Sequence, residues 1–227
     1  MRETTIVIPA YKPTSLLKKC VDSIIANTDL NKTEVLVVCN GSDKESAQYL
    51  LSNPYIRFAW YAEPLGFTIA ANIGLKMVRT PYVVLLNTDV EVLPFAPRDS
   101  WIDRLIQPFK DNPKIAVTGP ADMYARNRLY LPFFCVGLRK DLLEKFNYLD
   151  EIFSPGYGED VDFCFKVVDA GYELDLIAKN KTDESIQKYI SDYPVFHQGQ
   201  GSFEESGIML AQRGHQIIHE RYFKDKS

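Results

Sequence analysis

The first 90 residues alternate four times between short apolar segments and longer segments in which apolar side chains recur three or four positions apart. The short segments are rich in β-branched residues and are typical of strands, whereas the longer spacing is typical of helices. Because a strand–helix–strand unit returns to the sheet in the same direction, the pattern predicts a parallel sheet with helices on both faces. The predicted strands are 5–9, 34–39, 56–60 and 82–86, and the predicted helices are 44–51, 67–77 and one that opens at Pro13 or Thr14.

The rest of the chain is less regular. It contains no internal repeat, low-complexity tract or linker, so one α/β domain with two lobes is the simplest account of 227 residues. We expect helices at 101–110, 159–169 and 208–223, strands at 115–118 and 133–136, an extended piece at 193–196 and an exposed polar loop at 179–185.

The composition narrows the class of protein. With 46% hydrophobic and 25% charged residues, the chain is typical of a soluble globular protein. A net charge of −4 provides no general attraction for nucleic acid. No apolar run reaches the ~18–20 residues that span a bilayer, so we expect a cytoplasmic protein, with peripheral membrane contact as an open alternative. The four cysteines form no Cys-x-x-Cys pair and are expected to be reduced and buried.

Polar residues follow the strand predicted at 82–86, at the edge of the sheet where ligands of such folds bind. Asp89 stands there, in the sequence Asn87-Thr88-Asp89. A carboxylate in this place can hold a hard divalent cation, which in turn binds phosphate oxygens. An aspartate after a strand is also a common turn residue, and from spacing alone that structural interpretation is favoured.

Three acidic residues, Glu159, Asp160 and Asp162, stand at the start of the helix predicted at 159–169. Acidic side chains in a first turn complement the helix dipole, but three exceed what capping needs, and one of them is a candidate general base. The dipole lowers the pKa of such a carboxyl group, whereas repulsion among the three raises it. The sequence leaves this balance open.

The chain has only three histidines. His197 lies between an apolar segment and glycines, and it is equally compatible with a ligand and with a loop residue. His215 and His219 are four positions apart on the last predicted helix. This spacing can bind a metal, but no glutamate pattern accompanies it, so a helix face is the favoured interpretation.

Five segments together resemble the inverting family-2 glycosyltransferases of the GT-A fold, in the family's order and at similar spacing, from Thr5 to about Ser202. The resemblance implies a single GT-A domain with a mostly parallel sheet. Residues 1–91 would bind a nucleotide sugar, and residues 92–227 would bind the acceptor and end in a closing helix. The five segments are 5–11, 37–42, 65–67 with 71–74, 86–89 and 158–162.

The resemblance implies roles in donor binding. Asn40 stands where the family usually has an acidic residue that reads the edge of the base. An asparagine can still accept a hydrogen bond from the N3–H of uracil or thymine, but it carries no charge. The other implied roles are the nucleobase pocket for Pro9, Ala10 and Tyr11, the helix flanking the nucleotide for Asn72, and the ribose for Thr88.

The resemblance also implies a metal site and a catalytic base. Asp89 would bind the metal, with His197 as a second ligand, and Asn87 leaves the family's Asp-x-Asp motif with its last acid only. Asp160 matches the catalytic base, and Glu159 would help to orient the acceptor.

These roles imply a metal-dependent, inverting transfer of a hexose or deoxyhexose from a UDP- or dTDP-sugar to a hydroxyl of a glycan or glycoprotein. Mn²⁺ or Mg²⁺ would be the cofactor, UDP is the favoured nucleotide, and no nucleic acid is expected as a partner. A nucleotidyltransferase is a weaker alternative. An enzyme of that kind requires a glycine-rich phosphate-binding loop after the first strand, whereas residues 9–13 contain no glycine. A non-catalytic nucleotide-sugar-binding module is disfavoured by the joint presence of Asp89, Asp160 and His197.

Overall fold

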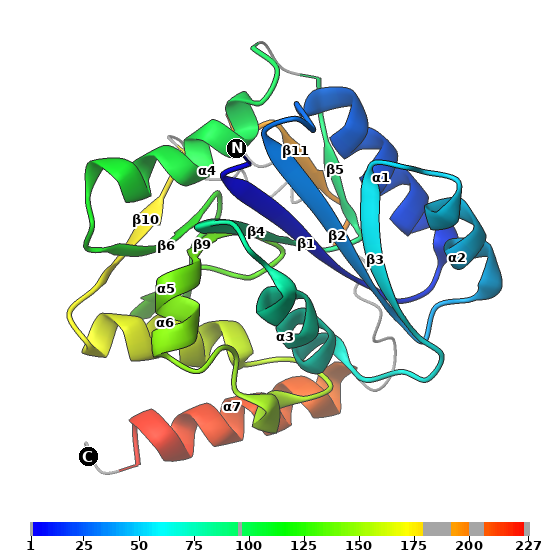
Figure 1. Cartoon of the computed structure of the whole chain (residues 1–227). Helices are drawn as coiled ribbons and strands as arrows, with labels where there is room; N and C mark the ends of the chain where they lie inside the picture. The colour runs from blue at the N-terminus through cyan, green and yellow to red at the C-terminus, as the bar shows by residue number, and fades with distance from the viewer. Residues whose placement is uncertain (1, 95–96, 179–191, 200–206, 225–227) are drawn as a thin grey trace.

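The computed structural model describes residues 2–94, 97–178, 192–199 and 207–224 (Figure 1). A seven-stranded sheet with the order β10-β6-β9-β4-β1-β2-β3 forms its centre. The loop predicted at 179–185 lies outside the described residues. The elements are β1 (Thr4–Ala10), α1 (Thr14–Asn27), β2 (Thr33–Asn40), α2 (Lys44–Leu51), β3 (Ile56–Tyr61), α3 (Phe67–Met77), β4 (Tyr82–Leu86), β5 (Val90–Val92), α4 (Ser100–Asp111), β6 (Ile115–Gly119), β7 (Met123–Ala125), β8 (Arg128–Tyr130), β9 (Cys135–Arg139), α5 (Lys140–Lys145), the 3₁₀ helix η1 (Glu151–Phe153), α6 (Glu159–Asp169), β10 (Glu173–Leu176), β11 (Val195–His197) and α7 (Gly207–Tyr222).

Four parallel strands, β4, β1, β2 and β3, form one half of the sheet, as predicted. β1 and β2 are buried along nearly their whole length, which explains their continuous apolar sequences. The register pairs Ala10 with Cys39 and Asn40 with Tyr61. The carboxyl ends of these strands therefore meet at one edge of the sheet.

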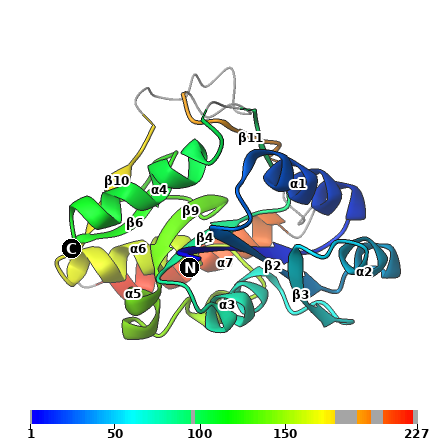
Figure 2. The same ribbon diagram turned by 45° about the horizontal axis from the view of Figure 1, so that its top comes forward.

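Helices cover both faces of the sheet (Figure 1 and Figure 2). On one face, α1, α2 and α4 pack against a core that includes Ile6 and Ile8 of β1. On the other face, α3, α5 and α6 pack against Val7 and its neighbours. Successive residues of β1 thus serve opposite cores, as the alternation of side chains along a strand requires. The predicted α/β class, with helices on both faces, is confirmed.

The second half differs from the prediction in its details. β9 runs antiparallel to both of its neighbours, β4 and β6, so the sheet is mostly rather than wholly parallel. The strand predicted at 133–136 begins at Cys135, and Phe133 and Phe134 precede it. The sequence pattern also misses β5, β7, β8, β10 and α5, because segments of three to six residues contain too few repeats of either period.

The state of the cysteines agrees with the sequence. All four are buried and free of disulfides, and burial raises the pKa of the Cys39 thiol to about 11. Within the described ranges, no helix combines the length and the apolar character that a membrane span requires.

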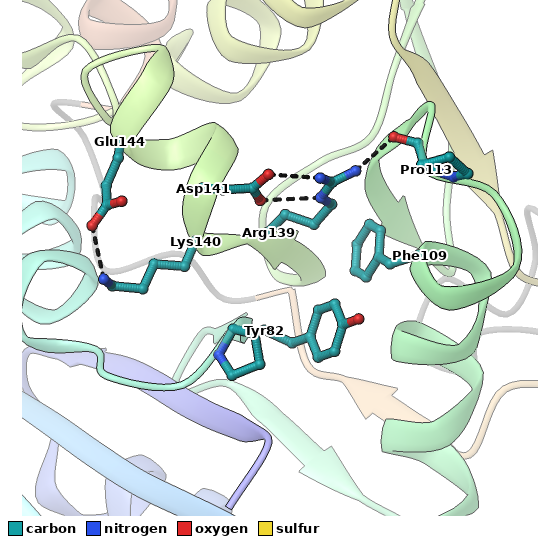
Figure 3. A pocket seen from close by; sticks show the side chains of 8 residues that line it. Tyr82, Phe109, Pro113, Arg139, Lys140, Asp141 and Glu144 are labelled. Carbon is teal, nitrogen blue, oxygen red and sulfur yellow. Dashed lines mark hydrogen bonds and ion pairs between the residues drawn. The ribbon is translucent and has the colours of Figure 1, made fainter.

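A shallow pocket of about 420 Å³ lies where β4 begins, at the edge of the sheet opposite its carboxyl ends (Figure 3). Its charged groups are paired with each other: Arg139 with Asp141, and Lys140 with Glu144. The ring of Tyr82 stacks on that of Phe109 beneath them. Paired charges over stacked rings stabilise this edge, so we assign the pocket a structural role.

Candidate active site

A second cleft, of about 710 Å³, opens at the carboxyl ends of the parallel strands. It receives residues from β1, β2, the segment after β4, the start of α6, β11 and α7, which lie far apart in the sequence. Eight of the residues expected to form the site line this cleft. They are Pro9, Tyr11, Asn40, Thr88, Asp89, Glu159, Asp160 and His197.

Two other expected donor-binding residues lie elsewhere. The side chain of Asn72 donates to the Leu149 carbonyl at 2.8 Å and accepts from the Leu149 N–H at 3.0 Å, so it ties α3 to the segment before η1. Ala10 is fully buried, and its carbonyl accepts a hydrogen bond from the Ser42 hydroxyl. Neither residue lines the cleft, so the structure gives both a role in the scaffold.

Asn40 lines the cleft, and the oxygen of its side-chain amide already accepts a hydrogen bond. Its side-chain oxygen accepts the backbone N–H of Leu65 at 2.5 Å. From the family resemblance this oxygen is expected to accept the N3–H of a pyrimidine, but in the structure it holds the loop before α3. No hydrogen bond among the described residues uses the amide nitrogen, so the group that Asn40 presents to a ligand is a donor.

Asp89 and His197 meet at one corner of the cleft. The Nε2 of His197 lies 3.3 Å from the Oδ2 of Asp89. The ribbon of β5 and β11 fixes this approach, because it pairs His197 with Val90, and the Gln198 N–H donates to the Asp89 carbonyl. The imidazole ring also stacks on Phe134, with centroids 4.2 Å apart.

This corner has the chemistry of a site for a divalent cation. The Oδ1 of Asp89 is buried and has no hydrogen-bond partner in the described part of the structure, which leaves a carboxylate oxygen available as a ligand. No cluster of three or more histidine, cysteine or acidic side chains with metal-binding geometry occurs in the described part of the chain. Two protein ligands suit Mg²⁺ or Mn²⁺, which usually take further ligands from substrate phosphates and water.

The three acidic residues in the first turn of α6 lie in two different surroundings. Asp162 is buried, and it binds Arg221 and the Tyr222 hydroxyl of α7 as well as Lys166 of its own helix. It therefore joins α6 to α7 and takes no part in the cleft. Glu159 and Asp160 line the cleft instead.

Burial raises the pKa of Asp160 to about 6, although hydrogen bonds from backbone N–H groups partly oppose this. Burial, and then the neighbouring charge of Asp160, raise the pKa of Glu159 further. Desolvation and repulsion thus outweigh the helix dipole, which resolves the balance that the sequence leaves open. A carboxyl with a pKa near neutrality is suited to act as a general base.

α7 closes the cleft on the side of α6. Arg213 donates to the carbonyls of Ile152 and Ser154, and the Cα of Gly214 packs on the Tyr157 carbonyl. These contacts place His215 on the lining of the cleft. From the sequence His215 is expected on an ordinary helix face, because no glutamate pattern accompanies its spacing with His219, and no local pattern shows that α7 returns to α6. Phe134 likewise lines the cleft without having been predicted, whereas Tyr130 and Tyr157 belong to the segments 126–130 and 154–157 that the sequence suggests as a wall for the acceptor.

We expect the replacement Gly214→Ala to destabilise the protein. A Cβ at this position would lie 2.3 Å from the backbone oxygen of Tyr157, and overpacking of this kind typically costs about 1–3 kcal/mol. The change should therefore lower the melting temperature, even though alanine favours a helix by about 1 kcal/mol over glycine. Thermal unfolding of wild type and variant would measure the change in melting temperature. Gln212→Ala, on the exposed side of the same helix, is the control, and a melting temperature raised by Gly214→Ala would contradict the packing described here.

The residues of the cleft and the fold that carries them can be compared with known proteins. The sequence pattern of glycosyl transferase family 2 matches residues 5–145, more than half of the chain. The chain belongs to glycosyl transferase family 2. The matched segment contains Asn40 and Asp89 but ends before Glu159, Asp160 and His197, so the roles of these last three residues rest on their geometry.

Curated relatives of this family-2 chain are longer than the chain itself. A pre-mycofactocin glycosyltransferase of Mycobacterium tuberculosis is 26% identical over 204 residues, which cover 76% of this chain and 40% of the relative. The O-antigen biosynthesis protein RfbC of Myxococcus xanthus is 27% identical over 120 residues, which cover 52% of this chain and 9% of the relative. The chain thus spans less than half the length of these relatives.

A solved structure of similar fold is the mannosyltransferase PcManGT of Pyrobaculum calidifontis, in complex with GDP-Man and Mn²⁺. Its TM-score to the family-2 chain is 0.61, at 17% identity over 77% of this chain and 55% of that chain. At this identity the likeness concerns the fold, which is the single α/β domain of GT-A glycosyltransferases.

Proposed function

We propose that the chain is a metal-dependent, inverting glycosyltransferase domain. It transfers a hexose or deoxyhexose from a nucleoside-diphosphate sugar to a hydroxyl of a glycan or glycoprotein. The observation that carries the proposal is where the buried polar side-chain atoms without a hydrogen-bond partner lie. Of six buried side-chain atoms without a hydrogen bond in the described structure, Arg57 and Asp162 have ion-pair partners. The other four belong to Asn87, Asp89 and Glu159, which line the cleft, and to Thr68, which lies next to Glu159.

Unsatisfied buried polar groups are rare, because each costs about 1–3 kcal/mol. Four of them gathered around one cleft are therefore best explained by a polar ligand that completes their hydrogen bonds. No lysine or arginine is present among the described residues that line the cleft. A diphosphate bound there needs another source of positive charge, and this favours a divalent cation at Asp89 and His197. When bound, such an ion offsets the negative charge that develops on the leaving diphosphate.

Asp160 is proposed as the general base. It accepts the proton of an acceptor hydroxyl while the hydroxyl oxygen forms a bond to the anomeric carbon of the donor. The bond from that carbon to the phosphate oxygen breaks at the same time, and the nucleoside diphosphate leaves with the bonding electron pair. A single displacement from the opposite face inverts the anomeric centre.

The nucleobase is proposed to be uracil or thymine, with UDP favoured. The amide nitrogen of Asn40 suits the O4 carbonyl that both bases carry, and Tyr11 and Pro9 supply flat apolar walls beside it. Guanine has a carbonyl at the corresponding edge of its ring. The GDP-Man bound by the structural relative makes guanosine sugars the appropriate comparison.

A thermal-shift screen tests this proposal. The melting temperature is measured with UDP-, dTDP- and GDP-sugars, each with and without Mn²⁺. A ligand that binds only the folded protein stabilises it in proportion to the logarithm of its concentration over its dissociation constant. We expect the largest shift with a UDP- or dTDP-sugar, and only with Mn²⁺ present. A larger shift with GDP-sugars would overturn the assignment of the base, and the absence of any shift would overturn the proposed function.

A further inference from the structure

Glu159 forms a second polar wall of the cleft, and Thr68 lies directly behind it. The Glu159 side chain comes from the first turn of α6 and is only 6% exposed, yet it lines the cleft. Its Oε2 has no hydrogen-bond partner among the described residues. The Thr68 hydroxyl, in the first turn of α3, is fully buried next to this carboxyl and does not itself line the cleft.

The wall formed by Glu159 lies on the side of the cleft that is expected to hold the donor. Successive residues of a helix point about 100° apart. Asp160 lies near Tyr130 and His215. Its charge contributes to the raised pKa of Tyr130, and the charge of His215 opposes the rise in the pKa of Asp160. Glu159 points toward α3, which begins directly after Leu65 and Gly66, and the N–H of Leu65 is held by Asn40. Glu159 and Asn40 therefore flank the same stretch of the cleft.

The chemistry of this wall suits a sugar hydroxyl. Burial beside Asp160 raises the pKa of Glu159, which favours its neutral form. A neutral carboxyl group both donates and accepts hydrogen bonds, as a sugar hydroxyl does. A phosphate would be a poor partner, because it offers no donor to a carboxylate and meets the charge of Asp160 nearby.

We propose that Glu159, with Thr68 behind it, binds a hydroxyl group of the sugar that is transferred, and so helps to select the donor sugar. This differs from the expectation that Glu159 orients the acceptor. The inference rests on the proposed function, because it takes the ligand of the cleft to be a nucleoside-diphosphate sugar. Asp160 acts on the acceptor in this arrangement, and its neighbour holds the donor.

Calorimetric titration can separate the two roles. Wild type, Glu159→Ala, Glu159→Gln and Thr68→Val are each titrated with UDP and UDP-glucose, and with dTDP and dTDP-glucose, in the presence of Mn²⁺. We expect Glu159→Ala to weaken the affinity for the nucleotide sugar about tenfold, as the loss of one or two hydrogen bonds predicts. The affinity for the nucleoside diphosphate should stay unchanged. Thr68→Val should act in the same direction with a smaller effect. Glu159→Gln, which keeps a donor and an acceptor, should restore most of the affinity.

The outcomes are distinguishable. Equal losses for nucleotide sugar and nucleoside diphosphate would show that Glu159 supports the fold of the cleft, and they would overturn the inference. A Glu159→Gln variant as weak as Glu159→Ala would do the same, because it would require an anion at this position. Glu144→Ala, an exposed acidic residue at the opposite edge of the sheet (Figure 3), is the matched control and should bind like wild type. A wild-type protein that binds none of the four ligands would instead reject the proposed function.

Discussion

Replacing Asp160 by asparagine is expected to lower the rate of sugar transfer by about 10²–10⁴-fold, the usual contribution of a general base. Binding of the nucleoside diphosphate should remain nearly unchanged. Asparagine has the shape of aspartate, and its side-chain oxygen can keep the hydrogen bond from the Val161 N–H. It cannot take a proton from the acceptor, so the turnover number should fall while the donor KM stays close to that of wild type. Initial rates over a range of donor concentrations separate the two parameters.

The dependence of the rate on pH gives this prediction a second measure. Because the pKa of Asp160 is raised to about 6, its carboxyl group becomes protonated, and inactive as a base, as the pH falls through that value. The wild-type turnover number should therefore decrease on the acid side, with a midpoint that belongs jointly to Asp160 and its neighbour Glu159. The small residual rate of Asp160→Asn should not show this decrease. Asp169→Asn, on the exposed end of the same helix, is the control and should retain the wild-type profile. A wild-type turnover number for Asp160→Asn would remove Asp160 from the role of base.

Much of this fold is predictable from the sequence, and the reason is physical. α2, α3, β4 and α6 begin and end at the predicted residues, because their apolar periodicity is sharp and turn residues bound them. The short element β5 escapes prediction, and so does its pairing with β11, which the sequence predicts only as an extended piece at 193–196. Their pairing depends on residues more than 100 positions apart, and no local pattern records such a contact. Yet this ribbon brings His197 to Asp89.

The candidate site shows the same division. Asp89 and Asp160 can be placed in the cleft from the sequence, because Asp89 follows a predictable strand and Asp160 stands in a segment that resembles the family, at the start of a predictable helix. His215 cannot, since it reaches the cleft only through the packing of α7. Asn72 shows the opposite error. A buried asparagine in a segment that resembles the family suggests a ligand contact, but its hydrogen bonds are used by the backbone of Leu149.

Replacing Asp89 by asparagine is expected to weaken the binding of Mn²⁺ by at least about tenfold, because even changes around the ligands of a metal usually cost 10–100-fold. The same change should weaken nucleoside diphosphate binding in the presence of Mn²⁺. Binding of the two is coupled if the ion joins the diphosphate to Asp89 and His197, and coupling between two ligands is reciprocal. Calorimetric titration of each ligand, alone and with the other at saturation, measures the coupling in wild type and in the variant.

A loss of folding would mimic this result, so the stability of the variant matters. The Oδ1 of Asp89 is buried and lacks a hydrogen bond among the described residues, so the change of the carboxylate to an amide should leave the melting temperature unchanged or raise it. Glu91→Gln, two residues away on β5 and exposed to solvent, is the matched control and should bind both ligands like wild type. If Asp89→Asn retained wild-type affinity for Mn²⁺ and the full coupling to the nucleoside diphosphate, the cation would have to bind elsewhere. The corner formed by Asp89 and His197 would then be no more than a hydrogen-bonded pair.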